Sequence, residues 1–491
     1  MPTNHCSRLI AGFFAISFVL FGPRAVAQPW LSDMSAIDIG DGYQVRTLTD
    51  GEGTWLAVWH SNGPTPEGAS YEYDIMMSRS VDNGLTWSPA APLNNNAATD
   101  AGNDRAPDLA FDGHGTWHVV WHSNDSLGGP LSDDFDILIA HSFDGGLSWT
   151  DPVFLNTNAA SDDRDDYRPH VATDRKGHCV AIWGDDRIVV SRSADYGMTW
   201  TPPITMNAST SRAIRGEVIT DGLGNWMIVW YANWGPNDVD AFVARSVDNG
   251  ASWSVPTALN INGPVDDGND FVPQIATDRQ GTWVAVWHSF STLGGTIGND
   301  NDILFARSLD NGVTWTFPEP LNEEHTNNGE DWEPHIATDE TGNWIVLWCS
   351  EAFGYRIVIS RSTDGARTWT APEVLGAAGT PSFTPRLGTD RNGSWVAAWQ
   401  AGSHDPYPYP VVTDVHSDVL LSQFSIPLCD LIGDMDCDGA VTPLDLASAS
   451  TCGGGPGSIN LTTECSRLDF NKDGDLDIHD FAGFQRACRR P

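Results

Sequence analysis

The sequence predicts an all-β fold, a seven-bladed β-propeller, on the strength of two repeated patterns. Ser-x-Asp-x-Gly-x-Ser/Thr-Trp occurs at residues 80–87, 142–149, 193–200, 246–253 and 308–315, and at 362–369 with Ala366 in place of glycine. A longer block precedes it and occurs seven times, ending at Trp59, Trp121, Trp183, Trp230, Trp287, Trp348 and Trp399. Such regular repetition, at spacings of 51 to 62 residues for the shorter pattern, is typical of a propeller or another array.

Each unit is predicted to contain four strands, as propeller blades do. The longer block, for example "FVPQIATDRQGTWVAVW" at 271–287, reads as two strands joined by a turn, and "DIMMSRS" at 74–80 reads as a third. The short pattern suits the following hairpin, because its Asp accepts backbone N–H groups, its Gly adopts positive φ and its Trp covers the turn. We therefore expect a structural role for Asp82, Asp144, Asp195, Asp248, Asp310 and Asp364.

The seventh unit lacks the short pattern and its fourth strand, because the sequence reaches "DVLLSQFS" at 418–425 and the repeat stops there. The segment at 28–40 contains Trp30 and Ile37 at nearly the spacing of Trp253 and Leu259 in another unit. We therefore expect residues 28–40 to supply the missing strand and close the ring. The alternative is six blades with an additional half-unit.

The first 27 residues are typical of a secretory signal peptide, with Arg8, an apolar run at 9–21 and the small-residue triplet at 25–27. The run has 13 residues, fewer than the roughly 20 that cross a bilayer, and no second candidate for a transmembrane segment follows. The mature chain is expected to be secreted, and so extracellular, periplasmic or attached to a cell surface. The net charge of −39 argues against nucleic acid and anionic membranes as partners.

The short pattern is the Asp box, and residues 28–426 resemble the sialidase-like propellers with BNR repeats. This resemblance implies that the ligand site lies on the face opposite the Asp boxes, where loops enter each innermost strand and join the second strand to the third. Propellers with Asp boxes include glycosidases, receptors and assembly factors. Two functions stay open: an exo-glycosidase of the sialidase type, or a non-catalytic scaffold that binds glycans or proteins.

One position on the predicted innermost strands is polar in every unit, four residues before the Asp that closes the strand. It holds Arg46, Asp108, His170, Glu217, Gln274, His335 and Arg386. Glu217 beside His170, with Asp108, offers candidate acid/base catalysis, and Arg46 next to Arg386 offers a clamp for a carboxylate. The alternative is a water-filled channel in which these polar groups satisfy one another.

Sialidases bind the substrate carboxylate with three arginines and use a Tyr–Glu nucleophile pair and an Asp acid/base. This chain has only partial counterparts of their first-strand motif, "DYRPH" at 166–170 and "YQVRT" at 43–47. The fourth unit loses the proline of its sister units and gains Arg215 beside Glu217. The expected substrate-binding residues are Arg46, Arg386, Arg215, Arg168, Tyr231, Gln274 and His335, and Tyr167 is a further candidate.

A second repeated feature is Trp-His-Ser at the end of three predicted second strands, with His60, His122 and His288. Aspartates precede the third strands (Asp74, Asp136, Asp240, Asp302) and the innermost strands (Asp104, Asp166, Asp270, Asp331). A rim of Asp and His can bind calcium or sugar hydroxyl groups. More often, such side chains cap loops and remain solvated.

After residue 427 the composition changes, and two segments have the spacing of a calcium-binding loop: "DMDCDGAVTPLD" at 434–445 and "DFNKDGDLDIHD" at 469–480. Oxygen ligands at alternating positions and Gly at position 6 suit Ca²⁺. The expected ligands are Asp434, Asp436, Asp438, the Ala440 carbonyl and Asp445 in the first loop, and Asp469, Asn471, Asp473, the Asp475 carbonyl and Asp480 in the second.

The paired loops end in Asp, and residues 429–488 resemble a dockerin, a small helical calcium-binding domain. The resemblance implies docking to a cohesin-like partner or another cell-surface protein through residues 427–491. The Gly-rich linker between the loops, bracketed by Cys452 and Cys465, departs from the dockerin pattern, and so do Pro443-Leu444 in the first loop. A calcium module that contacts only its own chain therefore remains an alternative.

Overall fold

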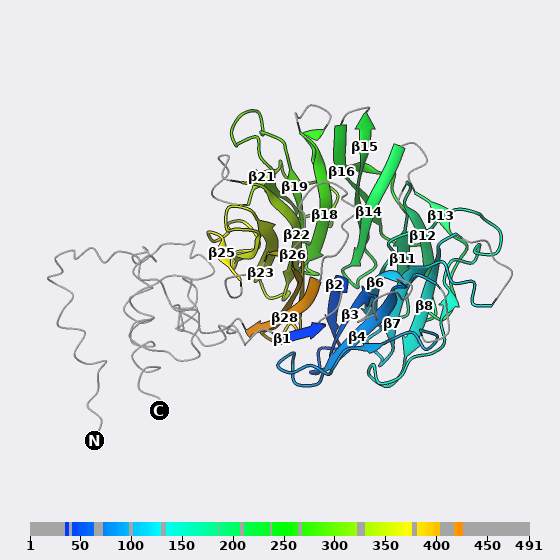
Figure 1. Ribbon diagram of the computed structural model, residues 1–491. Helices are drawn as coiled ribbons and strands as arrows, with labels where there is room; N and C mark the ends of the chain where they lie inside the picture. The colour runs from blue at the N-terminus through cyan, green and yellow to red at the C-terminus, as the bar shows by residue number, and fades with distance from the viewer. Residues whose placement is uncertain are drawn as a thin grey trace, which may run out of the picture. The chain divides into compact units, whose positions relative to one another are not determined.

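The computed structural model describes residues 35–38, 42–62, 72–97, 102–128, 134–184, 186–206, 211–235, 238–263, 268–321, 329–375, 381–402 and 417–425 (Figure 1). Residues 31–424 form one compact unit. The predicted signal peptide and the predicted calcium module lie outside the described residues. No helix in the described part of the chain is long and apolar enough to cross a membrane.

The described residues form seven four-stranded sheets, and in six of them the strands follow one another in sequence. Blade 1 contains β2 (Gly42–Thr49), β3 (Trp55–Ser61), β4 (Asp74–Ser80) and β5 (Ala91–Pro92). Blade 2 contains β6 (Arg105–Phe111), β7 (Trp117–Ser123), β8 (Asp136–Ser142) and β9 (Val153–Phe154). Blade 3 contains β10 (His170–Thr173), β11 (Cys179–Trp183), β12 (Val189–Ser193) and β13 (Ile204–Thr205).

The remaining blades continue this order around the ring. Blade 4 contains β14 (Ser211–Thr220), β15 (Trp226–Gly235), β16 (Asp238–Ser246) and β17 (Thr257–Ala258). Blade 5 contains β18 (Asp270–Thr277), β19 (Trp283–Ser289), β20 (Asp302–Ser308) and β21 (Glu319–Pro320). Blade 6 contains β22 (Asp331–Thr338), β23 (Trp344–Ser350), β24 (Arg356–Ser362) and β25 (Glu373–Val374). Blade 7 contains β26 (Ser382–Thr389), β27 (Ser394–Gly402), β28 (Ser417–Ser425) and β1 (Ser35–Asp38).

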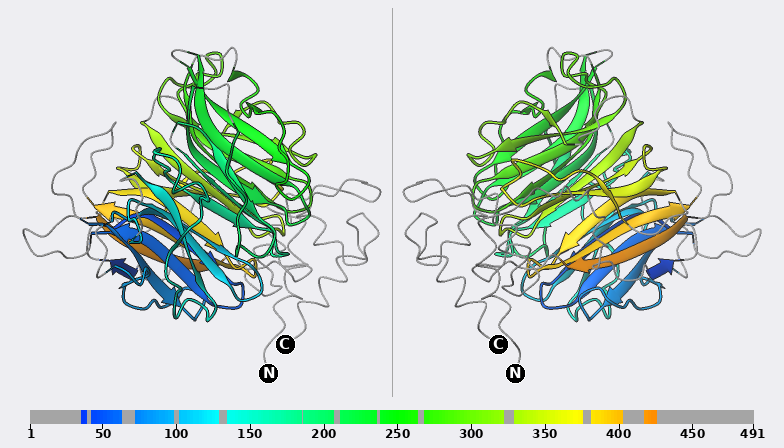
Figure 2. Two further views of the ribbon diagram at one scale, coloured as in Figure 1. Left: turned by 90° about the vertical axis from the view of Figure 1, so that its right-hand side faces the viewer. Right: turned by 90° about the vertical axis from the view of Figure 1, so that its left-hand side faces the viewer.

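The two ends of the propeller sequence meet in blade 7. Strand β1 pairs antiparallel with β28, with Ser35 opposite Leu421 and Asp38 opposite Val419. Figure 2 shows the dark-blue β1 beside the orange β28. First strands of successive blades also contact one another around the ring, including β26 with β2. The expected closure by the amino-terminal strand is confirmed, and the ring has seven blades instead of six and a half-unit.

The hydrophobic core lies between successive blades. The second strands β3, β7, β19 and β23 are buried along their whole length. One core cluster combines Leu56 and Val58 of blade 1 with Trp117 and Trp121 of blade 2. Because both faces of these strands pack against neighbouring blades, their sequences are apolar between the two tryptophans except for the buried His118 of β7, as expected of strands without a solvated face.

The Asp box forms the hairpin that the sequence predicts. In the first copy, Asp82 Oδ1 accepts hydrogen bonds from the Ser80 hydroxyl at 2.8 Å and the Thr86 N–H at 2.8 Å, and Oδ2 accepts from the Thr86 hydroxyl at 2.6 Å. Gly84 has φ of 83°, and a Cβ there would lie 2.6 Å from Val396 Cγ2 of blade 7. The glycine therefore serves both the turn and the contact with the preceding blade.

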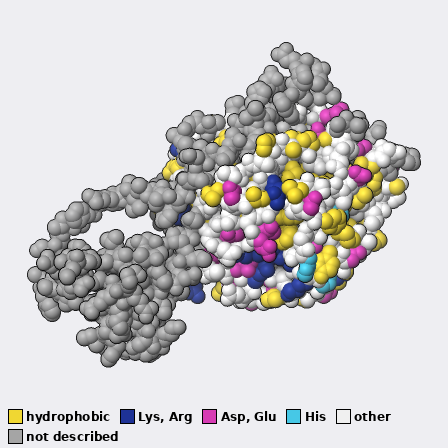
Figure 3. Space-filling model, turned by 90° about the horizontal axis from the view of Figure 1, so that it is seen from below, with side chains coloured by type: hydrophobic (Ala, Val, Ile, Leu, Met, Phe, Trp, Pro, Cys, Tyr) yellow, Lys and Arg dark blue, Asp and Glu magenta, His cyan; other side chains and the backbone are white. Residues whose placement is uncertain are grey.

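Charged side chains of both signs share the described surface. The face in Figure 3 carries dark-blue Lys and Arg side chains next to magenta Asp and Glu side chains, with apolar groups scattered between them. This is the surface of a chain with 26 Lys and Arg against 65 Asp and Glu. The basic side chains are few, so their positions are informative about ligands.

Candidate functional site

Each innermost strand is distorted just before the polar position that the sequence analysis singled out. Register shifts interrupt the pairing of six of these strands, for example between Tyr43 and Arg46 in β2 and between Phe383 and Arg386 in β26, whereas β10 begins only at His170, the polar position itself. The residue two positions earlier has φ between 48° and 54° in all seven blades. We call these residues the bulge ring: Gln44, Ala106, Arg168, Arg215, Val272, Glu333 and Thr384.

The bulge ring holds a conformation that non-glycine residues rarely adopt, so its neighbours must stabilise it. Proline follows the bulge residue in five blades, at Pro107, Pro169, Pro273, Pro334 and Pro385. Because proline has no N–H to donate, it suits a point where the strand pairing is interrupted. The bulge is the extra residue of a β-bulge, which redirects the side chain relative to the strand.

The histidines of Trp-His-Ser support the bulge of the next blade. His60 Nδ1 accepts the Ala106 N–H, His122 Nδ1 accepts the Arg168 N–H and His288 Nδ1 accepts the Glu333 N–H, each at 3.3 Å. Burial lowers the pKa of His60 to about 3 and that of His288 to about 4, so both rings are neutral acceptors at neutral pH. These histidines are therefore buried between blades and are not ligands on an open rim.

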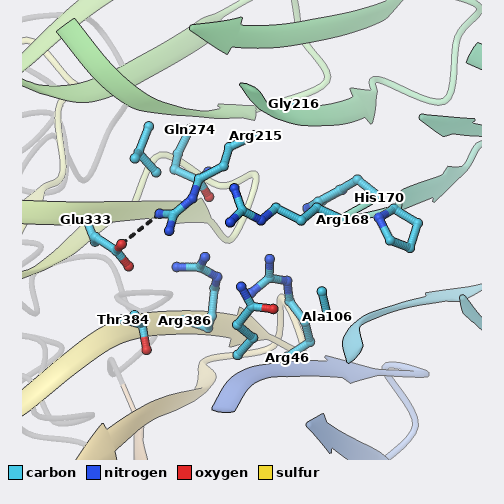
Figure 4. A pocket seen from close by; sticks show the side chains of 13 residues that line it. Arg46, Ala106, Arg168, His170, Arg215, Gly216, Gln274, Glu333, Thr384 and Arg386 are labelled. Carbon is cyan, nitrogen blue, oxygen red and sulfur yellow. Dashed lines mark hydrogen bonds and ion pairs between the residues drawn. The ribbon is translucent and has the colours of Figure 1, made fainter. Parts of the chain in front are cut away.

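The bulge ring and the polar channel position together form a pocket (Figure 4). Its cavity is about 70 Å³, which at about 10–15 Å³ for each water holds roughly five water molecules. Its described lining consists of Gln44, Arg46, Ala106, Arg168, Pro169, His170, Arg215, Gly216, Val272, Gln274, Glu333, Thr384 and Arg386. The enclosed space suits the charged group of a ligand, with the remainder of the ligand outside it.

Four arginines dominate this pocket. In Figure 4, Arg168 and Arg215 approach from one side and Arg46 and Arg386 from the other, and their guanidinium groups converge. Arg215 Nη1 donates to Glu333 Oε1 at 2.7 Å, whereas Arg386 Nη1 donates to the carbonyl of Pro385 at 2.8 Å. Burial, and then the proximity of Arg46, lower the pKa of Arg386 to about 9. The pocket thus gathers four guanidinium groups around one small cavity.

The carboxyl groups beside the pocket hold neighbouring blades together. Asp108 Oδ2 accepts the Val171 N–H at 2.8 Å, and Glu217 Oε2 accepts the Ile275 N–H at 3.3 Å. The same carboxylate of Asp108 lies 3.2 Å from His170 Nδ1 and 3.4 Å from Arg46 Nε. The structure therefore brings His170 to Asp108, whereas the sequence analysis paired it with Glu217.

The pKa values of two carboxyl groups near the arginines are shifted in opposite directions. Burial raises the pKa of Glu217 to about 8, although Arg386 and Arg46 oppose this. Burial also acts to raise the pKa of Glu333, but Arg215 and Arg386 outweigh it and lower the pKa to about 2. At neutral pH, Glu217 is mostly protonated and Glu333 is ionised. Such a pair has the protonation states that an acid and a base or nucleophile require.

The other expected residues lie in different surroundings. Gln274 lines the pocket and donates to the carbonyl of Pro273 at 3.1 Å. His335 does not line it, and burial holds its pKa well below the usual value. Tyr231 packs against Phe271, with ring centroids 5.5 Å apart, and Tyr167 packs against His122 at 5.2 Å. The described lining contains no tyrosine, so these residues do not assemble the Tyr–Glu pair of sialidases there.

Glu333, Gln44 and Thr384 line the pocket but were not predicted from the sequence. All three belong to the bulge ring, six residues before the Asp that closes each innermost strand. The ring is as variable in sequence as the channel position, and this variation was the available signal. In a regular strand, residues two positions apart point to the same face of the sheet. The bulge instead gives the bulge-ring side chain a direction of its own into the pocket.

Asparagine amides link rim aspartates of neighbouring blades by hydrogen bonds. The Asn94 amide donates to Asp104 Oδ2 at 2.8 Å and lies 3.5 Å from Asp74 Oδ1. The Asn156 amide likewise donates to Asp136 at 2.6 Å and Asp166 at 3.1 Å. Burial raises the pKa of Asp136 to about 6 and that of Asp166 to about 7. These buried hydrogen bonds have a structural role, because they connect neighbouring blades.

One group of carboxylates on this rim has the spacing of a cation site. Oxygens of Asp134, Asp136 and Asp162 all lie within 4.8 Å of one another. Carboxylate oxygens are the donors that Ca²⁺ prefers. One of these carboxylates also has a hydrogen-bond partner within the protein, because the Asn158 amide donates to Asp162 Oδ2. The expected calcium ligands of the C-terminal loops lie outside the described residues.

Comparison with known proteins agrees with this architecture. Residues 217–382 match the sequence model of one family, a BNR repeat-like domain. The chain is thus a seven-bladed β-propeller, part of which is similar to a BNR repeat-like domain. No curated protein matches the sequence.

Solved structures similar to this chain include two sialidases. Hadza microbial sialidase Hz136 is 15% identical with a TM-score of 0.43, over 79% of this chain and 66% of that chain. Trypanosoma rangeli sialidase in complex with the inhibitor DANA is 11% identical with a TM-score of 0.41, over 79% and 57%. A protein of unknown function from Dyadobacter fermentans DSM 18053 is 15% identical with a TM-score of 0.46, over 65% and 94%. This chain spans less than two thirds of either sialidase, and the similarity concerns the fold alone.

Proposed function

We propose that this protein recognises acidic glycans and holds their anionic group in the arginine pocket. The observation that carries the proposal is the convergence of Arg46, Arg168, Arg215 and Arg386, from four different blades, on one small cavity. Guanidinium groups bind carboxylates in bidentate geometry and keep their charge when buried. The cavity of about 70 Å³ fits such a group, and the sugar would extend into the open part of the site.

Hydrolysis of the bound glycan is a second candidate, favoured by the opposite protonation states of Glu217 and Glu333. In a glycosidase, a protonated carboxyl donates to the leaving-group oxygen and an ionised one acts as nucleophile or base. Glu333 borders the pocket, whereas Glu217 is 7% exposed and accepts a backbone N–H. Binding therefore fits the geometry more directly than turnover does.

A glycan array with the purified mature chain tests recognition. Acidic glycans, including sialosides and uronides, should bind and neutral glycans should not. Arg386→Gln should weaken binding by about tenfold or more, because a hydrogen bond to a charged group contributes roughly 1.5–3 kcal/mol. Arg245→Gln is the matched control: its guanidinium donates to Asn225 Oδ1, and it does not line the pocket. Equal binding of neutral and acidic glycans would contradict the proposal.

Fluorogenic sialosides and glucuronides distinguish an enzyme from a binding protein. If the chain is a glycosidase, Glu217→Gln should abolish release of the fluorophore while binding on the array persists. A folded chain that binds these glycosides without turnover would be a recognition protein.

We infer further that the chain is exported and attached to a cohesin-like or other cell-surface protein through residues 427–491. The support is the signal-peptide pattern at 1–27 and the two calcium-loop patterns at 434–445 and 469–480. Calorimetric titration of the chelator-treated mature chain should detect tight calcium binding that Asp434→Ala and Asp469→Ala each reduce. Unchanged binding in both variants would exclude these loops as the calcium sites.

A further inference from the structure

Glu333 is the one carboxylate among the described residues that line the pocket. The four guanidinium groups around it can donate hydrogen bonds but cannot accept them. Figure 4 shows the Glu333 side chain turned towards the space between Arg215 and Arg386. Burial acts to raise its pKa, but Arg215 and Arg386 outweigh burial and lower the pKa to about 2, so the side chain is ionised at neutral pH. The pocket therefore contains one strong hydrogen-bond acceptor among many donors.

Two hydrogen bonds fix Glu333 in this position. Its backbone N–H donates to His288 Nδ1 at 3.3 Å, at the bulge where its φ is 49°. Its Oε1 accepts a hydrogen bond from Arg215 Nη1 at 2.7 Å. A carboxylate has about four acceptor sites, and among the described residues only Arg215 donates to this one. Glu333 Oε2 is therefore available to a donor on the ligand.

A ligand carboxylate bound by the guanidinium groups would lie beside this fixed carboxylate. Glu333 Oε1 is 2.7 Å from Arg215 Nη1, so an anion at that guanidinium has an ionised oxygen as its neighbour. Like charges this close repel each other. A hydroxyl group next to the ligand's carboxylate offsets the repulsion, because it donates to Glu333 while the carboxylate accepts from arginine.

Acidic sugars differ in whether they carry such a hydroxyl group. In a uronide, the carbon that bears the carboxylate is bonded to C4, which carries a hydroxyl. In a sialoside, the neighbours of the corresponding carbon are a methylene group, the ring oxygen and the glycosidic oxygen. None of these can donate a hydrogen bond, so the two classes present different groups to Glu333.

We propose that Glu333 selects uronides by accepting a hydrogen bond from the hydroxyl group next to the ligand's carboxylate. This inference rests on the proposed recognition of acidic glycans and narrows its ligand class. The guanidinium groups of the pocket would bind the carboxylate, and the adjacent hydroxyl would donate to Glu333 Oε2. A sialoside, which has no donor next to its carboxylate, binds more weakly.

Isothermal titration calorimetry on the mature chain tests this with methyl β-D-glucuronide and its 4-deoxy analogue, two probes that differ by one hydroxyl group. The glucuronide should bind more tightly by about tenfold or more, the ratio expected for a hydrogen bond to a charged acceptor. The methyl α-glycoside of N-acetylneuraminic acid should bind less tightly than the glucuronide.

Glu333→Gln separates recognition of the ligand from support of the fold. The amide is a weaker acceptor and does not repel an anion, so the affinity ratio of the two probes should fall towards one. The 4-deoxy probe should bind this variant at least as tightly as the wild type, whereas a purely structural role of Glu333 would weaken both probes in parallel.

Two further variants check the assignment. Arg215→Gln removes the partner that holds the Glu333 carboxylate, so it should also lower the affinity ratio of the two probes. Arg245→Gln, outside the pocket, should leave the ratio unchanged. Circular dichroism melting curves establish that each variant is folded.

The outcomes separate this inference from the function on which it rests. Equal affinity of the wild type for the glucuronide and its 4-deoxy analogue overturns the inference alone, in a comparison that needs no variant. A ratio that persists in Glu333→Gln, or a sialoside that binds more tightly than the glucuronide, also overturns it and leaves recognition of acidic glycans standing. Failure of every acidic probe, in calorimetry and on the array, overturns both.

Discussion

At the scale of the residue, the position of a pocket side chain depends on a hydrogen bond between its own backbone N–H and a side chain of the preceding blade. Glu333 has φ of 49°, an uncommon conformation for a side chain of its size. Its N–H donates to His288 Nδ1, and its carboxylate pairs with Arg215. The histidine thus positions a pocket residue without contacting a ligand, because it is only 8% exposed behind the bulge.

Replacement of His288 should separate its support of the bulge from the chemistry of the pocket. His288→Ala leaves the partly buried Glu333 N–H without its acceptor, which should lower the free energy of unfolding by roughly 1–3 kcal/mol. His288→Gln should retain most of the stability, since blade 7 has Gln400 at the corresponding position, which accepts a hydrogen bond from the Thr384 hydroxyl and donates one to the Gly42 carbonyl. Urea denaturation followed by tryptophan fluorescence measures both.

The pH dependence of stability provides the check on that assignment. Burial lowers the pKa of folded His288 from about 6.5 to about 4, so the unfolded chain binds a proton more readily between these values. The stability contributed by the neutral ring is therefore present above pH 6.5 and is lost as the pH falls to about 4. The Gln variant should lose less stability than the wild type over this window, and identical pH profiles would contradict the assignment.

At the scale of the element, the repeated chemistry of the turns was predictable from the sequence and the distortion of the innermost strands was not. The Asp box was recognised because the geometry of its turn depends on residues within eight positions, and Asp82, Ser80 and Thr86 make the expected bonds. Even the exceptional Ala366 adopts φ of 59° in the turn, although it lacks the freedom of glycine.

The β-bulge of the innermost strands could not be read from the same sequence. It is stabilised by atoms from the preceding blade, such as His288 Nδ1 for Glu333, and such long-range partners leave no local pattern. Arg46 and Arg386 were singled out because their position varies among apolar neighbours. Glu333 was missed, and the contact between His170 and Asp108 was not singled out, because distances between blades depend on the whole ring.

At the scale of the whole molecule, the pocket exists because the ring is closed. Arg46 belongs to blade 1 and Arg386 to blade 7, the first and last blades of the chain, and strand β1 joins blade 7 to the amino-terminal end of the sequence. Blades 1 and 7 also share a hydrophobic core cluster, in which Ala57 and Trp59 of blade 1 pack with Val396 and Ala398 of blade 7. Closure of the ring therefore determines the separation of these two arginines in the pocket.

Deletion of the closing strand tests this dependence. A mature chain that begins at residue 39 lacks β1, so β28 loses its antiparallel partner and becomes an exposed edge. The melting temperature should fall by several degrees, because backbone hydrogen bonds and the packing of the outer strand are lost together. Binding of acidic glycans should weaken as well, since the arginines of blades 1 and 7 would no longer be held at a fixed separation.

A chain that begins at residue 35 is the matched control, because it keeps β1 and removes only the residues before it. It should melt and bind as the mature chain does. Differential scanning calorimetry and the glycan array compare the three chains at equal concentration, and gel filtration detects pairing through the new edge. If the chain lacking β1 melts and binds like the control, blade 7 closes without its outer strand. The pairing of β1 with β28 is then not what maintains the pocket.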